Sequence, residues 1–221
     1  MRKLIAAAFV TLDGVMQAPG APEEDRSGGF EFGGWVKPHW DDLLGEDLGQ
    51  LFGRPFDLLL GRKTYDIFAA YWPYQPADDP IGSLFDRVAK YVVTSSTEPL
   101  GWRNSTALNG DPAATVRRLK QGDGPDLLTQ GSAQLLQALH AAGLIDEYRL
   151  KVFPVVLGRG KRLFAEGAAP ATLKLTEAKT SDAGVTLATY LPAGPVVTDS
   201  FATEEPSALE LARRERVARE G

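Results

Sequence analysis

The sequence predicts an α/β fold, with a mainly parallel central sheet, helices on both faces and an antiparallel hairpin near the C-terminal end. Two observations lead to this prediction. Short apolar runs alternate with helical patterns along most of the 221 residues, which is typical of parallel strands joined by helices. Further on, alternating apolar residues flank a Ser-Asp-Ala-Gly segment, the pattern of two antiparallel strands joined by a turn.

The strands are predicted from the short apolar runs, taken in chain order. The parallel part of the sheet is expected at residues 3–11, 56–61, 89–94, 126–130 and 147–153. Leu173 alternates with Leu175, and Val185 alternates with Leu187, so the hairpin is expected at 172–191.

Capping residues mark two of the connecting helices. Asp111 followed by Pro112 supplies an N-cap and a first helical residue, and Gly122 ends that helix. Ser132 is expected to cap the next helix, whose leucines recur at core spacing before Gly143.

Composition and length favour one globular domain followed by a tail. The chain is 43% hydrophobic and 24% charged, and it is long enough for one sizeable core. We therefore assign residues 1–192 to one domain and residues 193–221 to a charged tail. The formal net charge of -5 argues against a general nucleic-acid binder, which needs a broad cationic surface. With no cysteine, the chain has no disulfide framework, thiolate nucleophile or cysteine metal site.

Neither the histidines nor the first residues indicate a metal site or an exported protein. His39 and His140 are the two histidines and lie far apart in sequence, so no metal site is expected. The apolar run at 4–10 is short and Asp13 follows it, so we interpret it as a buried strand rather than a signal peptide. No window approaches the roughly twenty apolar residues that span a bilayer. The sequence therefore predicts a cytoplasmic protein with no membrane partner.

The segment 17–34 is rich in glycine, proline and acidic residues. It is longer than an ordinary connection between two elements. Two interpretations stay open, a lid or wall of a substrate site and a disordered loop.

The tail 193–221 is predicted to contain a short helix. Ser207 and Glu210 form a capping-box pair before a thin apolar stripe. A stripe this narrow does not hold a helix by itself in water. The helix therefore docks on this subunit, docks on a partner subunit, or frays.

Two predicted strands end in the same way. The strand at 56–61 runs into Gly61, Arg62, Lys63 and Thr64, and the strand at 126–130 runs into Gly131, Ser132, Ala133 and Gln134. Where a parallel strand gives way to a helix, the first N–H groups of the helix lack partners and carry the positive end of its dipole. Two such ends at one sheet edge are able to hold a diphosphate between them.

Other residues refine this anion site. The adjacent Arg62 and Lys63 favour a terminal phosphate monoester, hence a phosphorylated cofactor, and the strand end at 91–96 presents hydroxyls to a ribose phosphate. A glycine after a strand also makes an ordinary turn, so each signal alone is weak. Neither junction carries the GxGxxG or P-loop pattern, which disfavours those two classes.

Five blocks carry a resemblance to a known family: LIAAAFVTLDG, LLLGRKTYD, YVVTSS, LLTQGSAQLLQAL and IDEYRLKVFPVVLGRGKRLF. Their order resembles the dihydrofolate reductase superfamily, and most closely the reductase domain at the C-terminus of the riboflavin-biosynthesis protein RibD and its stand-alone relatives. The resemblance covers roughly residues 2–192. It implies a dihydrofolate-reductase-like three-layer fold, NADPH as the hydride donor, a small-molecule substrate and a homodimer.

The resemblance also implies where NADPH would bind. Arg62 and Thr64 would contact the 2′-phosphate and the diphosphate, with Gly61 and Lys63 beside them. The other implied contacts are Ser95 and Ser96 near the adenosine, Gln130, Gly131, Ser132, Ala133 and Gln134 at the second helix start, and Ala7, Leu12 and Gly14 at the nicotinamide. Gln130 stands where the family usually has the first glycine of a Gly-Gly pair.

Three carboxylates are candidate catalytic residues. Asp13 matches a substrate-side aspartate of the RibD-like pattern, although an aspartate after a strand also caps a turn. Asp41 and Asp42 are the nearest match to the buried carboxylate of dihydrofolate reductases, although adjacent carboxylates at a helix start are commonly partners of the helix dipole.

The resemblance and the strand ends together predict an NADPH-dependent reductase of a pyrimidine or pterin-like molecule. The leading assignment is the 5-amino-6-(5-phosphoribosylamino)uracil reductase step of riboflavin biosynthesis. Dihydrofolate reductase proper and a catalytically inactive NADPH-binding sensor are the alternatives. No deaminase zinc motif precedes the reductase region in this chain, so a bifunctional riboflavin enzyme is not expected.

Overall fold

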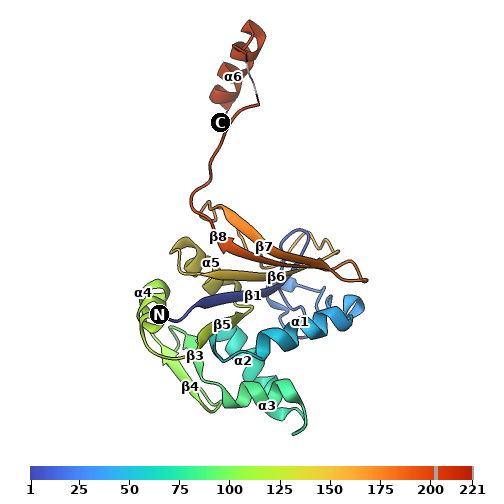
Figure 1. Cartoon of the computed structure of the whole chain (residues 1–221), viewed down its shortest axis with the longest axis vertical. Coiled ribbons are helices and arrows are strands. Elements are labelled where there is room, and N and C mark those ends of the chain that lie inside the picture. The colour runs from blue at the N-terminus through green and yellow to red at the C-terminus, as the bar shows by residue number, and fades with distance from the viewer. Residues whose placement is uncertain (202–203, 221) are drawn as a thin grey trace.

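Within residues 1–201 and 204–220, which the computed structural model describes, one eight-stranded sheet lies between two layers of helices (Figure 1). The strand order across the sheet is β4-β3-β2-β5-β1-β6-β8-β7. The strands are β1 Leu4–Thr11, β2 Phe56–Gly61, β3 Lys90–Val93, β4 Ser105–Leu108, β5 Asp126–Gln130, β6 Glu147–Phe153, β7 Leu173–Thr180 and β8 Thr186–Pro192.

Pairing is parallel throughout the sheet except at β8, which runs antiparallel to both of its neighbours, β6 and β7. The predicted α/β fold with a mainly parallel sheet and a C-terminal hairpin is confirmed. Each parallel strand predicted from an apolar run lies within one residue of its expected bounds. The sequence does not predict β4, because its four residues, Ser-Thr-Ala-Leu, form no apolar run.

Helices cover both faces of the sheet, as predicted (Figure 1). They are α1 Asp42–Phe52, α2 Arg62–Tyr71, α3 Pro80–Arg87, α4 Pro112–Gln121, α5 Ala133–Ala141 and α6 Ala208–Glu220. The apolar cluster on one face of the sheet includes Leu48 of α1, Tyr65 of α2 and Phe85 of α3. Val116 of α4 and Leu136 of α5 belong to the cluster on the opposite face. The helices that follow β2 and β5 therefore lie on opposite sides of the sheet.

The helix caps agree with the sequence in one case and differ in the other. Asp111 accepts a hydrogen bond from the N–H of Ala114 at 2.7 Å, and Gly122 ends α4, as predicted. Ser132 occupies the N-cap position of α5, but its side chain makes no capping hydrogen bond. The prediction that its hydroxyl caps the helix is wrong because Ser132 is left-handed, with φ +67° and ψ +58°, whereas a capping residue is normally extended.

Arg2 holds together the amino-terminal ends of three strands. Its side chain, 2% exposed, forms an ion pair with Asp57 of β2. Its Nε donates to the carbonyl oxygen of Pro125, directly before β5, at 2.5 Å. Because Arg2 itself precedes β1, one guanidinium fixes β1, β5 and β2 in relation to one another.

The two edge strands of the sheet differ in length. β4 has only four residues. β7 has eight, mostly exposed, and its pairing with β8 shifts register between Leu175 and Glu177. Lys174 and Lys179 lie on this edge strand.

The segment 17–34 is folded, so the interpretation of it as a disordered loop is wrong. Gln17 donates from Nε2 to the carbonyl oxygens of Asp25 and Ser27, both at 3.0 Å. Phe30 is 3% exposed and packs in a small apolar cluster. Asp25 also forms an ion pair with Lys161, which fastens the segment to the chain that follows β6.

The tail helix α6 stands away from the sheet and its helices (Figure 1). Ser207 accepts a hydrogen bond from the N–H of Glu210 at 3.3 Å, as the capping-box pattern predicts. None of the residues of α6 is buried, so docking on this subunit is wrong, and docking on a partner subunit and fraying stay predictions. In the described part of the chain, no helix combines the length and the apolar character that crossing a membrane requires.

Candidate functional site

The two predicted anion-binding strand ends lie side by side. β2 and β5 are neighbouring parallel strands, so their carboxyl ends are at the same sheet edge. The N–H of Gly61, at the end of β2, donates to the hydroxyl of Ser132, at the start of α5, at 2.9 Å. Since α2 and α5 depart to opposite faces, the neighbouring ends of β2 and β5 form a topological switch point, where open α/β sheets bind ligands.

Both helix starts leave their backbone amides open to a ligand. Neither α2 nor α5 has a side-chain capping hydrogen bond at its first turn. Gly131 has φ +77°, and a Cβ placed there would lie 3.9 Å from the side chain of Thr64. A Cβ on Gly61 would lie 3.5 Å from Ser132. The two glycines therefore keep side chains out of the space between the helix starts, where the amides favour an anion.

Arg62 links the start of α2 to the loop after β3. Its Nε donates to Asp66 at 2.8 Å and its NH1 donates to the carbonyl oxygen of Glu98 at 2.9 Å. The Ser96 hydroxyl accepts from the N–H of Glu98 at 3.1 Å, so the loop that carries Ser95 and Ser96 turns toward Arg62. Lys63, next to Arg62, is exposed. The structure thus brings Arg62 into contact with the loop that carries the two serines assigned to the adenosine end.

Ala7 and Gln130 lie next to each other on β1 and β5. The N–H of Gly131 donates to the carbonyl oxygen of Ala7 at 3.3 Å, which joins β1 to the second helix start. The Nε2 atom of Gln130 is buried and has no hydrogen-bond partner in the described residues. A buried donor without a partner costs about 1–3 kcal/mol, so this amide is a candidate ligand contact.

Leu12 and Gly14 lie in the turn after β1, at the same sheet edge. Leu12 is 66% exposed, and its N–H donates to the carbonyl oxygen of Val155 at 2.9 Å. Gly14 has φ +79°, and its N–H donates to the carbonyl oxygen of Thr11, which closes the turn. Within the described residues, no hydrogen bond joins this turn to either helix start. Their place at the nicotinamide therefore stays a prediction.

A cavity of about 430 Å³ opens at the start of α5. Its walls include Ala133 and Gln134 from the helix and three cations from the chain after β6, which are Arg159, Lys161 and Arg162. Sequence reasoning did not assign these cations to the site. The only signal for them is the Gly-Arg-Gly-Lys-Arg run, which looks like an ordinary basic turn.

Asp13 fixes the chain that follows β6. Its Oδ1 accepts from the Thr11 hydroxyl at 2.5 Å and its Oδ2 from the N–H of Gly158 at 2.8 Å, and it also accepts from the N–H of Leu157 at 3.2 Å. Burial raises the pKa of Asp13, but the hydrogen bonds from Thr11, Gly158 and Leu157 outweigh burial and hold the pKa below its usual value. Asp13 is therefore an anion at neutral pH and is poorly suited to donate a proton.

We expect Asp13→Asn to lower the unfolding free energy at neutral pH and to make it depend less on pH under acidic conditions. The pKa of Asp13 is lower in the folded protein than in the unfolded chain, where it is near 3.9. Asp13 therefore contributes fully to the unfolding free energy at pH values above the pKa of the unfolded chain. This contribution is lost as the pH falls through the pKa of the folded protein. Melting temperatures of both proteins, measured from pH 7 downward, should converge below about pH 4. A gap that stays constant throughout would contradict this role.

Asp41 and Asp42 lie at a different place from the two helix starts. Asp41 is the N-cap of α1, accepting from the N–H of Leu44 at 3.2 Å, and it also accepts from the N–H of Ala183 in the β7–β8 turn at 3.3 Å. Burial raises the pKa of Asp41, but hydrogen bonds from the Ser181 hydroxyl and from backbone amides lower it overall. Asp42 is exposed in the first turn of α1. Both carboxylates thus behave as helix-start residues. Asp41 contacts the turn before β8, which is three strands from β5 in the sheet order.

Two uncharacterized proteins of Bacillus subtilis (strain 168), YyaP and YwjB, are similar to this chain. YyaP is 28% identical over 194 residues, which cover 86% of this chain and 94% of YyaP. YwjB is 33% identical over 109 residues, which cover 49% of this chain and 58% of YwjB. Neither relative has a described activity that bears on function.

Solved structures share the fold. A protein of Shewanella sp. PV-4 with a proposed role in riboflavin biosynthesis has a TM-score of 0.65 and 21% identity, over 86% of this chain and 99% of that chain. A pyrimidine reductase-like protein of Corynebacterium diphtheriae has a TM-score of 0.53 and 14% identity, over 87% and 92%. Dihydrofolate reductase of Enterococcus faecalis, complexed with NADP(H), has a TM-score of 0.54 and 12% identity, over 86% and 96%. At these identities the likeness establishes the dihydrofolate-reductase-like fold.

A family profile described as the RibD C-terminal domain matches residues 2–187. The five sequence blocks that resemble this family all fall inside the matched range. The match covers most of the 221 residues, and the fold agrees with it. The chain therefore belongs to the RibD C-terminal domain family.

Proposed function

We propose that the protein is an NADPH-dependent reductase of a small pyrimidine or pterin-like molecule, acting as a cytoplasmic homodimer. The observation that carries this proposal is the contact between the two helix starts, where the N–H of Gly61 lies 2.9 Å from the Ser132 hydroxyl. Membership of the RibD C-terminal domain family supports it. So does the fold shared with a dihydrofolate reductase that was solved with NADP(H).

The residues present fit NADPH. The amides at the starts of α2 and α5 would hold its diphosphate, because two glycines leave room for the phosphates to reach the backbone. Arg62 and Lys63, with Ser95 and Ser96 across from them, would hold the 2′-phosphate. Gln130, whose Nε2 atom has no partner in the described residues, pairs with Ala7, which the family resemblance assigns to the nicotinamide.

When bound, NADPH supplies a hydride to an electrophilic carbon of the substrate. The double bond that accepts the hydride also needs one proton at its other atom. Asp13 is unsuited to supply it, since hydrogen bonds that it accepts from Thr11 and from the backbone of Gly158 and Leu157 lower its pKa. Water that reaches the bound substrate is the proposed proton source. The protein would hold the cofactor against the substrate and shield them from water, and it would form no covalent bond to either.

The leading substrate is 5-amino-6-(5-phosphoribosylamino)uracil. The compound appears in the name of a bifunctional Thermotoga maritima protein, a deaminase and 5-amino-6-(5-phosphoribosylamino)uracil reductase. That protein has the same fold, with a TM-score of 0.57 and 15% identity over 87% of this chain and 57% of that chain. Dihydrofolate reductase proper is less well supported, because Asp41 and Asp42 are engaged in capping α1 and in the β7–β8 turn. A catalytically inactive sensor would bind NADPH without oxidising it in the presence of any pyrimidine or pterin.

We expect NADPH to raise the melting temperature more than NADH does, and Arg62→Ala to remove most of that difference. A ligand that binds only the native state stabilises it by an amount that grows with the logarithm of its affinity. Losing a hydrogen bond to a charged group costs about 1.5–3 kcal/mol, so NADPH affinity should fall at least about tenfold while NADH affinity hardly changes. Arg118→Ala, at an exposed arginine of α4, is the matched control. Equal shifts for both cofactors in the wild-type protein would contradict the 2′-phosphate site.

A further inference from the structure

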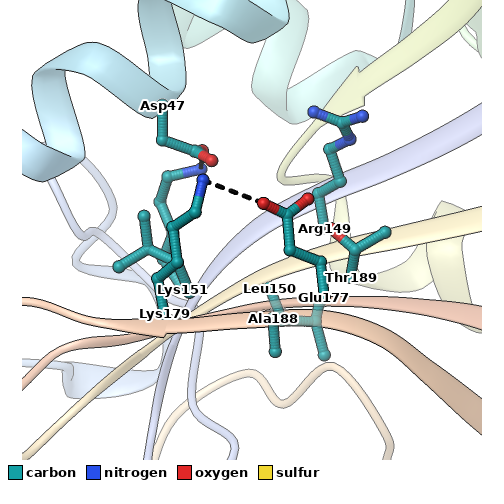
Figure 2. Close-up of a pocket in the computed structure, with 9 residues that line it drawn as sticks. Asp47, Arg149, Leu150, Lys151, Glu177, Lys179, Ala188 and Thr189 are labelled. Atoms are coloured by element: carbon teal, nitrogen blue, oxygen red, sulfur yellow. Dashed lines mark ion pairs between the residues drawn. The ribbon is translucent and has the colours of Figure 1, made fainter.

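The charged side chains beneath α1 satisfy one another. Figure 2 shows Asp47 reaching from α1 toward Lys151 of β6, and Lys179 beside Glu177 on β7. These two pairs lie at 2.6 Å and 2.8 Å. The space that they enclose is about 10 Å³, enough for one water molecule, so the cluster leaves no room for a larger ligand. At the other edge of the sheet, after β4, the exposed side chain of Asn109 is in a different situation.

The chain contains two asparagines, and the structure holds them differently. Asn104 directly precedes β4, and its side-chain amide donates to the carbonyl oxygens of Asp86 and Arg87 at 3.2 Å and 3.1 Å. Asn109 directly follows β4, is exposed, and makes no hydrogen bond within the described residues. The amide of Asn104 is therefore held in place, and the amide of Asn109 is free to move.

Gly110, which follows Asn109, leaves its backbone nitrogen accessible. It is exposed and has φ +103°, and a Cβ placed on it would meet Thr115 alone among the described residues, at 4.0 Å. Its N–H makes no hydrogen bond in the part of the chain that the structure describes. Because glycine has no side chain, nothing separates this nitrogen from the side chain of Asn109. Asn104 lacks this arrangement, since Ser105 follows it.

Little structure restrains the turn between β4 and α4. The turn consists of Asn109, Gly110 and Asp111, the N-cap of α4. β4, which precedes it, is an edge strand of four residues that pairs with β3 alone. Segments with few buried contacts open locally at low free-energy cost. The turn is therefore expected to reach the geometry in which the nitrogen of Gly110 meets the side chain of Asn109.

This geometry favours loss of the side-chain amide, a reaction to which asparagine is prone. The backbone nitrogen of Gly110 attacks Cγ of Asn109 and forms a five-membered imide ring, and the bond from Cγ to Nδ2 breaks. Nδ2 leaves as ammonia, with the proton that the nitrogen of Gly110 gives up. Water then opens the ring at either carbonyl and leaves an aspartate or an isoaspartate. No electrons are transferred, and water is the co-reactant.

We propose that Asn109 and Gly110 form a self-modification site, at which a neutral amide becomes a carboxylate as the protein ages. Each conversion adds one negative charge to a chain whose formal net charge is -5. The isoaspartate product also routes the backbone through the side chain, directly before the N-cap of α4. The reaction needs neither an enzyme nor a cofactor.

The new carboxylate arises at the sheet edge that carries the proposed cofactor site. The N–H of Thr94 donates to the carbonyl oxygen of Leu108 at 3.1 Å, so the end of β4 lies beside the start of the loop after β3. β4 is two strands from β2, or about 10 Å, and Arg62 follows β2. A negative charge at this distance repels the 2′-phosphate that Arg62 is proposed to bind. This consequence rests on the proposed function, whereas the modification itself does not.

Peptide mapping by mass spectrometry tests the modification, in protein stored in mildly alkaline buffer. Trypsin releases residues 104–117 as one peptide, and fragmentation of that peptide distinguishes the two asparagines. Since exposed turns open at almost no cost, Asn109 should be converted in the folded protein within about threefold of its rate in guanidinium chloride. Asn104 should be converted only in the unfolded protein. An unconverted Asn109, or equal conversion of Asn104 in the folded protein, would overturn the proposal.

Two variants test the consequence for the cofactor. Asn109→Asp carries the product charge from the start, so its NADPH affinity should fall about two- to threefold at low ionic strength. High salt should abolish the difference from the wild-type protein. Asn109→Gln is the matched control, because it keeps a neutral amide and its longer side chain closes a ring far more slowly. It should bind NADPH as the wild-type protein does and resist conversion.

The outcomes separate the modification from the proposed function. If the wild-type protein binds NADPH and Asn109→Asp binds it equally well at low ionic strength, the consequence for the cofactor is overturned. If the wild-type protein does not bind NADPH, the proposed function is overturned, and the mass measurement still decides the modification site.

Discussion

Gly131→Leu is expected to lower NADPH affinity about 100-fold, equivalent to about 2.7 kcal/mol. Gly131 lies between the two helix starts, and a side chain there would fill the space that the diphosphate needs to reach the backbone amides. Titration of the purified protein with NADPH, followed by fluorescence or calorimetry, measures the change. An affinity within threefold of the wild-type value would contradict the placement of the diphosphate.

Gly143→Leu is the matched control for this variant. Gly143 follows the other end of α5 and has φ +63°, close to the +77° of Gly131, and a Cβ there would meet nothing within 4 Å. Both substitutions force a leucine into the left-handed region, at a cost of about 1–2 kcal/mol each. We therefore expect similar falls in melting temperature for the two variants and a loss of NADPH binding only in Gly131→Leu.

Arg2→Met is expected to lower the unfolding free energy by about 3–5 kcal/mol and the melting temperature by about 10 °C. The substitution leaves the carboxylate of Asp57, whose side chain is 13% exposed, without its cation. It also removes the hydrogen bond to Pro125 that joins β5 to the start of the chain. Chemical denaturation and calorimetry measure the two quantities.

Arg2→Met combined with Asp57→Leu tests the cause of that loss. If the unpaired charge is responsible, the double variant should recover most of the stability, because no charge is left buried without a partner. The hydrogen bond to Pro125 is still lost, so a deficit of about 1 kcal/mol should remain. A double variant as unstable as Arg2→Met would show that the pairing of Arg2 with Asp57 is not the cause.

The parallel core of the fold was predictable because each of its strands buries a short apolar run. Val92, Leu128 and Leu58 lie in such runs and are at most 1% exposed, so periodicity alone locates their strands. β4 lacks this signal, since its two middle residues are exposed, its two end residues are only half-buried, and it is held by pairing with β3. Its position depends on a neighbour distant in sequence, which no local pattern reveals.

The candidate site was predictable where backbone geometry defines it and not where long-range contacts do. Glycine at the end of a strand, as at Gly61 and Gly131, is a local signal, and the structure brings these two positions together. Asp13 is different, because its role depends on the amides of Gly158 and Leu157, about 145 residues away. Ser132 looks like a helix cap in sequence, but its hydroxyl serves a neighbouring strand end instead.

The two borders of the sheet also affect how the protein behaves at high concentration. An unpaired strand border is a template on which other chains add and aggregate. β4 offers only four residues for such growth. β7 is irregular, because its pairing with β8 shifts register between Leu175 and Glu177, and it carries Lys174 and Lys179. Both borders therefore resist amyloid-like growth. Any stable self-association of the folded chain is expected to use side-chain surfaces rather than extension of the sheet.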